Sequence, residues 1–542
     1  MAAAAAPLRC HLSDFPDELL LRILSFLPAR DATAAAVLSR RWRSLWLSSG
    51  VVYLDSRSFG RSSWQTERNF SSYERRTTQC EDCKGFLRAA AKALAAAAAA
   101  APITRLTFVA KIDSLICRPD VLSDDRDLLA AVLSNPAVRR VEELHVEVEH
   151  WSGLPLRFAS LPSESLRVLR AVNCSPVAAP AAAAFPRLAE LHLHDCNVPL
   201  VELQPIVHAA PQLATLHLES CRIREKEEVS YTPPGMAAQV YRLVCPAVTA
   251  LVFESCDFEI SVELDAPRLQ SFRYMGAVQL CDRLSLNPIR PISMIQVANL
   301  HLTEDHNAII GRGQVCIPSL FWRFIRNFRT AKVLRLKLDF SMDRIALEMI
   351  QDNDMLDGHT ILFRNLKRLD LDAQYTLGNE ASSMVTLANL LHGSPVVHDL
   401  RLKLRRDMLN WMNKPPSVDQ EARADFNKSV DRFRHRRTPM RSQLGGEGHH
   451  KTLMHSHLGG EEDDNDYKAS DIIPVLSEQS FNCLDNSLRR ASLHSCMDKS
   501  NCLGVQLAKF FAKNARVLEE MHIDDGSHKM CEHMNASVSE MG

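Results

Sequence analysis

The chain has 542 residues, of which 46% are hydrophobic, and its 64 Lys and Arg residues balance 65 Asp and Glu residues. A single hydrophobic core rarely grows past roughly 250–300 residues, so we expect more than one structural unit. The formal net charge of -1 lacks the basic excess that binding to a phosphate backbone needs, which argues against nucleic acid as a partner.

The fifteen cysteines are an odd number and are scattered along the chain. The first residues show neither a basic leader nor an apolar run of signal-peptide length, and the longest uncharged stretch, 171–186, is interrupted by three prolines. We therefore expect a soluble protein with reduced thiols, located in the cytoplasm or the nucleus, with no membrane span.

Residues 15–46, "FPDELLLRILSFLPARDATAAAVLSRRWRSLW", predict three short helices. Pro16 suits a first helical position, and Pro28 ends the first helix. Asp31 and Ser39 are the expected caps of the second and third helices. A unit below about 40 residues cannot bury this many apolar side chains alone, so the helices need the rest of the chain or a partner protein. An ordinary terminal helical cap is the alternative.

Residues 12–46 resemble an F-box, the module that docks a protein onto the Skp-type adaptor of a cullin-based ubiquitin ligase. The matching residues include Phe15-Pro16, Leu27-Pro28 and the run "VLSRRWRSLW", which is especially similar to plant F-boxes. The resemblance implies a three-helix F-box within residues 10–50 whose apolar faces complete a core shared with the adaptor. The adaptor-binding residues that it implies are Leu12, Phe15, Pro16, Leu20, Ile23, Leu24, Leu27, Pro28, Val37, Leu38, Trp42, Leu45 and Trp46.

After a connector at 51–100 with an Ala-rich helix, one phrase recurs over residues 101–404: apolar, two residues, apolar, one residue, apolar. Such a repeat predicts stacked units, each one strand and a return segment, around a continuous core. The spacing resembles leucine-rich repeats, and the uneven intervals predict an irregular α/β solenoid, with another kind of α/β sheet as the alternative. The clearest copies are "LAELHLHDC" (188–196), "LATLHLESC" (213–221), "VTALVFESC" (248–256), "LQSFRYMG" (269–276), "VANLHL" (297–302), "AKVLRLKL" (331–338), "LKRLDLDA" (366–373) and "VHDLRLKL" (397–404).

Four of the cysteines, Cys174, Cys196, Cys221 and Cys256, follow strand phrases directly. They take the Asn/Cys position of the repeat, where a small buried polar side chain can meet backbone groups as the chain leaves the strand. We expect a structural role for them and no metal ligation.

Side chains between the strand leucines point to the opposite face, which we expect to be a concave surface that binds a target protein. A solvated polar face is the alternative. Basic residues on two phrases flank the acidic residues on the phrase between them, which predicts two basic rows beside an acidic row and favours a partner of alternating sign. The candidates are His192, His194, His217, Glu219, Arg273, His301, Arg335, Lys337, Asp370, Asp372, Arg401 and Lys403.

Residues 405–470 mix charge, glycine and histidine without a periodic apolar pattern, which predicts a disordered insert or linker. Its "RHRR" (434–437) is interpreted as solvated charge, with nuclear import as the alternative, and its histidines could bind a metal adventitiously: His449, His450, His455 and His457. Beyond it, "CLDNSLRRASL" and "AKFFAKNARVLEEM" resemble the FBD region of plant F-box proteins. They imply an FBD-like unit at 471–526, followed by a tail at 527–542.

The sequence has no phosphate loop, no H-E-x-x-H, no G-x-S-x-G and no dinucleotide fingerprint. Cys80 and Cys83 lack a second pair at zinc-finger distance, and "HKMCEHM" (528–534) is incomplete. We therefore expect a non-catalytic chain without a cofactor. The F-box resemblance implies that it recognises the substrate of an SCF-type ubiquitin ligase by binding the adaptor, the cullin scaffold and an unidentified target. The alternatives are an F-box repeat protein without a degradation target, and a hydrolase with its site in an unusual loop.

Overall fold

The structure is a computed structural model that describes residues 15–58, 72–111, 128–149, 154–179, 184–225, 240–286, 295–304, 317–346, 363–376, 380–406, 474–477, 479–495, 497 and 502–524. The chain divides into two units. Unit 1 comprises Met1–Ser271 and Arg283–Ser293, and unit 2 comprises Phe272–Asp282 and Met294–Gly542.

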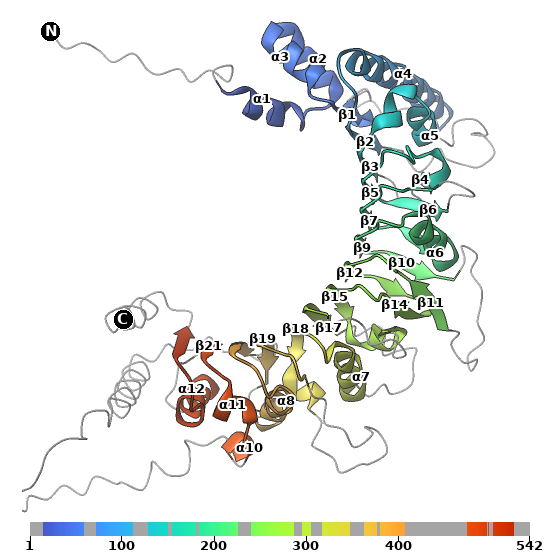
Figure 1. Cartoon of the computed structure of the whole chain (residues 1–542). Helices are drawn as coiled ribbons and strands as arrows, with labels where there is room; N and C mark the ends of the chain where they lie inside the picture. The colour runs from blue at the N-terminus through green and yellow to red at the C-terminus, as the bar shows by residue number, and fades with distance from the viewer. Residues whose placement is uncertain are drawn as a thin grey trace, which may run out of the picture. The chain divides into compact units, whose positions relative to one another are not determined.

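The main sheet of unit 1 consists of parallel strands that neighbour one another in chain order (Figure 1). Leu144 on one strand pairs with Leu169 on the next, and the same one-to-one register continues through Leu191 and Leu216 to Leu251. Each of these leucines is at most 1% exposed, so the stacked strands bury a continuous leucine ladder. The strands are β1 (Val51–Asp55), β2 (Arg105–Lys111), β3 (Glu143–Glu149), β5 (Val168–Val172), β7 (Glu190–His194), β9 (Thr215–Glu219) and β12 (Ala250–Glu254).

The return segments of unit 1 cover one side of this sheet (Figure 1). They include the helices α4 (Ser72–Ala100), α5 (Leu128–Leu133) and α6 (Leu200–Ala209). They also include short strands in three small sheets, β4 (Leu154–Arg157), β6 (Cys174–Ala178), β8 (Asn197–Pro199), β10 (Arg222–Arg224), β11 (Val240–Val244), β13 (Asp257–Phe258), β14 (Ser261–Asp265) and β16 (Leu284–Leu286). We call the opposite side of the sheet the open face.

Unit 2 has the same architecture. Its sheet has a ladder of Leu300, Leu336, Leu371, Leu402 and Leu493 in register. The strands are β15 (Ser271–Ala277), β17 (Val297–Thr303), β18 (Val333–Ser341), β19 (Arg368–Tyr375), β20 (Asp399–Arg406), β21 (Arg490–Ser495) and β22 (Glu520–Asp524). The helices are α7 (Ile317–Ile325), α8 (Glu380–His392), α10 (Pro474–Ser477), α11 (Asn482–Asn486) and α12 (Leu503–Asn514).

Three helices precede the first sheet: α1 (Asp17–Leu24), α2 (Ala29–Leu38) and α3 (Arg40–Ser48). The side chain of Ser39 accepts a hydrogen bond from the backbone N–H of Trp42, which confirms the predicted cap of α3. The predicted cap of α2 is wrong, because this helix begins at Ala29 and Asp31 lies within its first turn, where a carboxylate suits the helix dipole. No helix in the described part of the chain is long and apolar enough to cross a bilayer.

The recurring phrases all lie on parallel main-sheet strands of the two units, which confirms the predicted repeat. The first sheet begins earlier than expected, at β1, because "VVYLD" pairs in register with β2 although it lies in the segment assigned to the connector. Strand β20 continues to Arg406, two residues into the expected linker. The rest of that linker up to 470 and the tail 527–542, with the histidine cluster and "RHRR", lie outside the described residues.

The chain leaves four strands of unit 1 through a residue with positive φ, followed by a buried cysteine. These residues are Asn173, Asp195, Ser220 and Ser255, with φ of 53°, 57°, 50° and 52°. The Sγ of Cys221 lies 3.3 Å from the carbonyl oxygen of Leu193 on the preceding strand, and Cys256 and Cys196 make equivalent contacts. These contacts confirm the predicted backbone role of the cysteines. Burial raises the pKa of Cys174 to about 12, so its thiol stays protonated at neutral pH.

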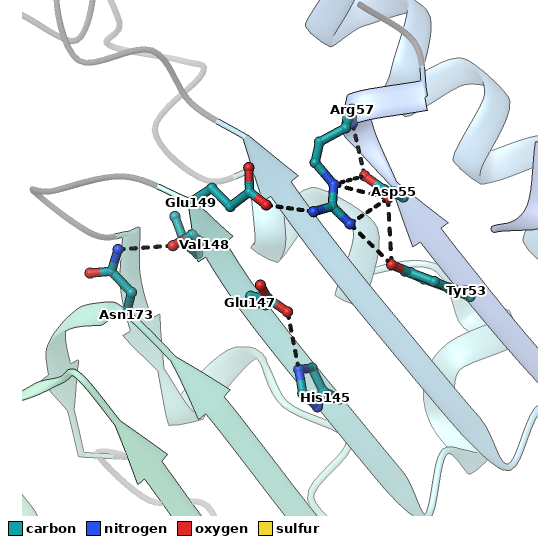
Figure 2. A network of polar contacts seen from close by, with 8 residues as sticks. All are labelled: Tyr53, Asp55, Arg57, His145, Glu147, Val148, Glu149 and Asn173. Atoms are coloured by element: carbon teal, nitrogen blue, oxygen red, sulfur yellow. Dashed lines mark hydrogen bonds and ion pairs between the residues drawn. The ribbon is translucent and has the colours of Figure 1, made fainter. Parts of the chain in front are cut away.

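A polar network fixes the end of β1 against β3 (Figure 2). The guanidinium of Arg57 donates to both carboxylate oxygens of Asp55, at 2.9 and 2.8 Å, and to Glu149 at 2.5 Å. It also donates to the hydroxyl of Tyr53 at 3.2 Å. The Asp55 side chain is only 8% exposed, so its carboxylate has lost most of its contact with water. The guanidinium of Arg57 supplies the hydrogen bonds that water would otherwise make.

The turn geometry predicts an order of stability at position 255, whose side chain is exposed. A β-branched residue is strained in the left-handed region, so Ser255→Val should lower the free energy of unfolding by about 1 kcal/mol. Ser255→Gly removes the Cβ and should equal or exceed the wild type. Urea unfolding of the three chains measures this order, and a valine variant as stable as the glycine variant would contradict it.

The network around Arg57 predicts a further difference in stability. Arg57→Met removes charged hydrogen bonds from a buried carboxylate and should lower the free energy of unfolding by about 1–3 kcal/mol. The matched control is Arg105→Met, which removes a 2.6 Å pair with Glu143 whose partners are 51% and 40% exposed, and it should cost no more than about 1 kcal/mol. Equal losses in urea unfolding would mean that the Asp55 contact contributes no more than a surface pair.

Candidate functional site

The three N-terminal helices have a small core of their own. Leu20 and Leu24 on α1 are 0% and 3% exposed, and Trp42, Leu45 and Trp46 on α3 are each below 10%. Arg41 ties the two helices together, because its guanidinium donates to the Asp17 carboxylate at 2.5 Å and to the Phe15 carbonyl at 2.8 Å. The five core residues were predicted to bind an adaptor. They are buried within the chain, where they pack α1 and α3 together, and their part in adaptor binding stays a prediction.

Other apolar side chains of α1, α2 and their connection are exposed. Val37 is 82% exposed, Phe26 is 68% exposed and Leu19 is 47% exposed. Pro16 is also exposed, whereas the remaining predicted residues of this stretch, Phe15, Ile23, Leu27 and Pro28, are half-buried. Leu12 and the side chain of Leu38 lie outside the described residues. We call Leu19, Phe26 and Val37 the exposed apolar set.

The helices α2 and α3 pack against β1 and α4, around a cavity of about 980 Å³. Phe86 and several alanines of α4 line one wall, and Arg30, Arg40, Arg43 and Lys92 contribute basic side chains. This packing holds the N-terminal helices against the first strand of the repeats.

Two histidines and three glutamates gather on the open face of unit 1. His192 on β7 and His217 on β9 are register partners, and their Nδ1 atoms lie 3.2 Å apart. The Nε2 of His192 lies 3.2 Å from a carboxylate oxygen of Glu190. Burial lowers the pKa of His192, which favours its neutral form. The Nε2 of His217 lies 3.9 Å from Glu219, and one ligand atom each of His217, Glu219 and Glu254 lie within 4.8 Å of one another.

The predicted rows of charge are present on the open face of unit 2. Asp370 on β19 pairs in register with Arg335 on β18 and with Arg401 on β20. Asp372 pairs in the same way with Lys337 and with Lys403. The prediction that two basic rows flank an acidic row is therefore confirmed.

The acidic row is neutralised within the sheet. Asp370 lies 3.4 Å from the guanidinium of Arg335, and Asp372 lies 3.4 Å from the ammonium of Lys403 and 2.7 Å from Arg405. The two carboxylates are only 21% and 26% exposed, whereas the Arg335, Arg401 and Lys403 side chains are each at least 50% exposed. The basic side chains are therefore the more exposed members of these pairs.

The other predicted face residues are Arg273, His301 and His194. Arg273 on β15 is exposed. His301 on β17 bonds to Asp339 on β18 at 2.5 Å. Burial raises the pKa of Asp339, but hydrogen bonds and charge from His301 and Lys337 outweigh it and lower the pKa overall. His194 is half-buried and lies beside Glu219 in register.

Sequence reasoning missed Glu254, Glu190 and two members of the exposed apolar set, Leu19 and Phe26. Leu19, Ile23 and Phe26 fall at helical spacing, as do Leu20, Leu24 and Leu27, so the pattern alone gives two candidate faces. Glu254 occupies the same position in "VTALVFESC" as Glu219 occupies in "LATLHLESC". An alignment of the two phrases would have identified Glu254 as a candidate.

Comparison with known proteins gives two family matches. Residues 12–52 match the F-box domain, and residues 129–350 match the LRR repeats of the FBD-associated F-box protein At5g56370. Neither of these matches indicates a catalytic domain.

Relatives in Arabidopsis thaliana match over short segments. The putative FBD-associated F-box protein At1g50980 is 63% identical over 35 residues, which cover 6% of this chain and 10% of that protein. The F-box/FBD/LRR-repeat protein At5g22700 is 50% identical over 49 residues, which cover 9% of this chain and 11% of that protein. The matched segments thus span about a tenth of the length of these relatives. With an F-box match at the N-terminal helices and a repeat match over the stacked strands, the chain contains an F-box domain and leucine-rich repeats similar to those of FBD-associated F-box proteins.

Proposed function

We propose that the chain is the substrate-recognition subunit of an SCF-type ubiquitin ligase. It docks a Skp-type adaptor and, through it, the cullin scaffold, and it holds a target protein on the repeats in the cytoplasm or nucleus. The F-box match implies the adaptor, and the exposed apolar set is the observation that carries the proposal. Three large apolar side chains that remain in water on a small helical unit are typical of an interface that a partner covers.

In this proposal the chain itself performs no chemistry. Holding the target beside the transferase of the ligase raises the effective concentration of target lysines, which converts a bimolecular encounter into an intramolecular one. The basic rows of unit 2 favour an acidic segment of the target, because the acidic row between them is already neutralised. We therefore propose an acidic partner segment in place of the partner of alternating charge that the sequence favoured.

The first test concerns adaptor docking. Phe26→Asp and Val37→Asp each place a charge in the proposed interface and should weaken binding of a Skp-type adaptor by about 30-fold or more, as hot-spot losses do. Titration calorimetry with the full chain measures the affinity. The matched control is Val240→Asp on β11, which is 59% exposed and lies outside the F-box.

A second control separates docking from folding. Leu20→Asp buries a charge in the core of α1 and α3 and should unfold these helices, whereas the Phe26 and Val37 variants should keep their helical circular dichroism. Wild-type affinity in both exposed-site variants would rule out docking through the exposed apolar set. A different outcome is that cullin is recovered with the adaptor complex while no bound partner accumulates when the proteasome is inhibited. That result would favour an F-box protein without a degradation target.

The second test concerns the target. Neutralising the basic rows with Arg335→Gln and Lys337→Gln should reduce target capture but change the free energy of unfolding by no more than about 0.5 kcal/mol at these positions. Glutamine is preferred to glutamate, because a carboxylate at 335 would face Asp370. Proximity labelling with matched expression measures the partners.

The control for this test is the pair Arg489→Gln and Arg516→Gln. These side chains are 59% and 78% exposed and each pairs with one carboxylate, so the net charge changes equally. Adaptor affinity should stay constant in both double variants. If both retain the wild-type set of partners, the target surface lies elsewhere on the chain.

A further inference from the structure

The histidines on the open face of unit 1 form a hydrogen-bonded chain whose proton positions follow from its geometry. A carboxylate only accepts, so the Nε2 of His192 must donate to Glu190. Neutral His192 then accepts at Nδ1, and the only donor that this contact offers is the Nδ1–H of His217. With its proton on Nδ1, a neutral His217 presents the lone pair of its Nε2.

This nitrogen lies in an unusual setting. It is buried, and within the described part of the chain it has no hydrogen-bond partner. The nearest carboxylate, Glu219, lies 3.9 Å away and cannot donate to it. A buried nitrogen without a hydrogen-bond partner is energetically costly. In neutral His217, a group that accepts an electron pair, such as a metal ion, would satisfy this nitrogen.

Two carboxylates meet at the same place. Glu219 on β9 and Glu254 on β12 are register partners, and like charges directly opposite each other destabilise a sheet. Their oxygens and the histidine nitrogen lie within 4.8 Å of one another. A cation between them could bind both carboxylates and the lone pair of His217 at the same time.

We propose that unit 1 binds a divalent transition-metal ion here, with the Nε2 of His217 and the carboxylates of Glu219 and Glu254 as its ligands. Zn²⁺ fits best, because one imidazole and two carboxylates match its usual donors, and tetrahedral ligands at the usual bond lengths lie roughly 3.4 Å apart. Small side-chain rotations close the remaining distance. Mg²⁺ fits poorly, because it prefers oxygen ligands throughout.

His192 and Glu190 act as positioning residues behind this site. They hold the ring of His217 through its Nδ1, much as a hydrogen-bond acceptor holds the outer N–H of a metal-bound histidine; here the acceptor is a second histidine backed by a carboxylate.

The chain contains its own comparison site. His145 and Glu147 on β3 have the same spacing, on the same face, with 3.7 Å between the imidazole and the carboxylate (Figure 2). The register partners of Glu147 are Val109 and Val172, and one partner of His145 is Arg170. This pair therefore lacks the second carboxylate in register and has a cation beside it.

Zinc uptake by the full chain tests the proposal. Background binding is removed first by replacing the histidines at 449, 450, 455 and 457 with glutamine and the cysteines at 80 and 83 with serine in every sample. The protein is stripped with a chelator, dialysed against Zn²⁺ and analysed for metal, and competition with a chromophoric chelator gives the affinity. Dialysis against Co²⁺ adds a spectrum that distinguishes nitrogen and oxygen ligands from thiolates.

We expect one Zn²⁺ per chain, no displacement by Mg²⁺, and a Co²⁺ spectrum without thiolate bands. His217→Gln and Glu254→Gln should each lower the affinity at least about 100-fold, and His192→Gln by about 10- to 100-fold, as losses behind a ligand do. His145→Gln with Glu147→Gln should leave it unchanged. Zn²⁺ should also raise the Tm of the wild type but not of the ligand variants, each compared with its own metal-free melt.

Two results would overturn the site. The first is a stripped chain that takes up no Zn²⁺. The second is a set of ligand variants that bind Zn²⁺ as tightly as the wild type and as the double variant at His145 and Glu147. Thiolate bands in the Co²⁺ spectrum would likewise assign any bound metal to cysteines instead. None of these outcomes bears on adaptor binding, which the docking variants test separately.

Discussion

Strand register is the constraint on which the rest of the structure depends. Each strand buries its leucines only against its neighbours, and a slip of one residue would turn the whole ladder to the open face. The same register that aligns Leu191 with Leu216 places His192 beside His217, one residue further along. In unit 2 the alignment of Leu336 with Leu371 sets Lys337 beside Asp372. The polar clusters are therefore consequences of how the core is packed.

Because the apolar phrase repeats with the register, the sequence predicted the strands and the rows of charge well. The sequence did not predict strands that are too short to show the repeating apolar phrase. Strand β1 has the sequence "VVYLD" without the full phrase, and β8, β10 and β13 have only two or three residues each. Their pairing is decided by neighbours that lie far away in sequence, and a pattern read along one segment does not contain that information.

The N-terminal helices show a second kind of limit. Two sets of apolar residues lie at helical spacing on α1, and the sequence does not say which one faces α3. Packing settles the question, because Leu20 and Leu24 are buried while Leu19 remains half exposed. The family resemblance therefore identified the F-box, and only the packing shows which of its apolar side chains lie in the core of the chain.

A parallel repeat also has an electrostatic consequence, since stacking in register puts equivalent side chains in columns. A column of like charge repels itself unless a neighbouring column supplies the opposite charge. Unit 2 meets this requirement with protein side chains, because Arg335, Arg401 and Lys403 surround the two aspartates. In unit 1 the glutamates at 219 and 254 are stacked directly, with the lone pair of His217 turned toward them. Unit 2 thus balances its columns with side chains of opposite charge, whereas unit 1 places a histidine beside its two glutamates, at the proposed cation site.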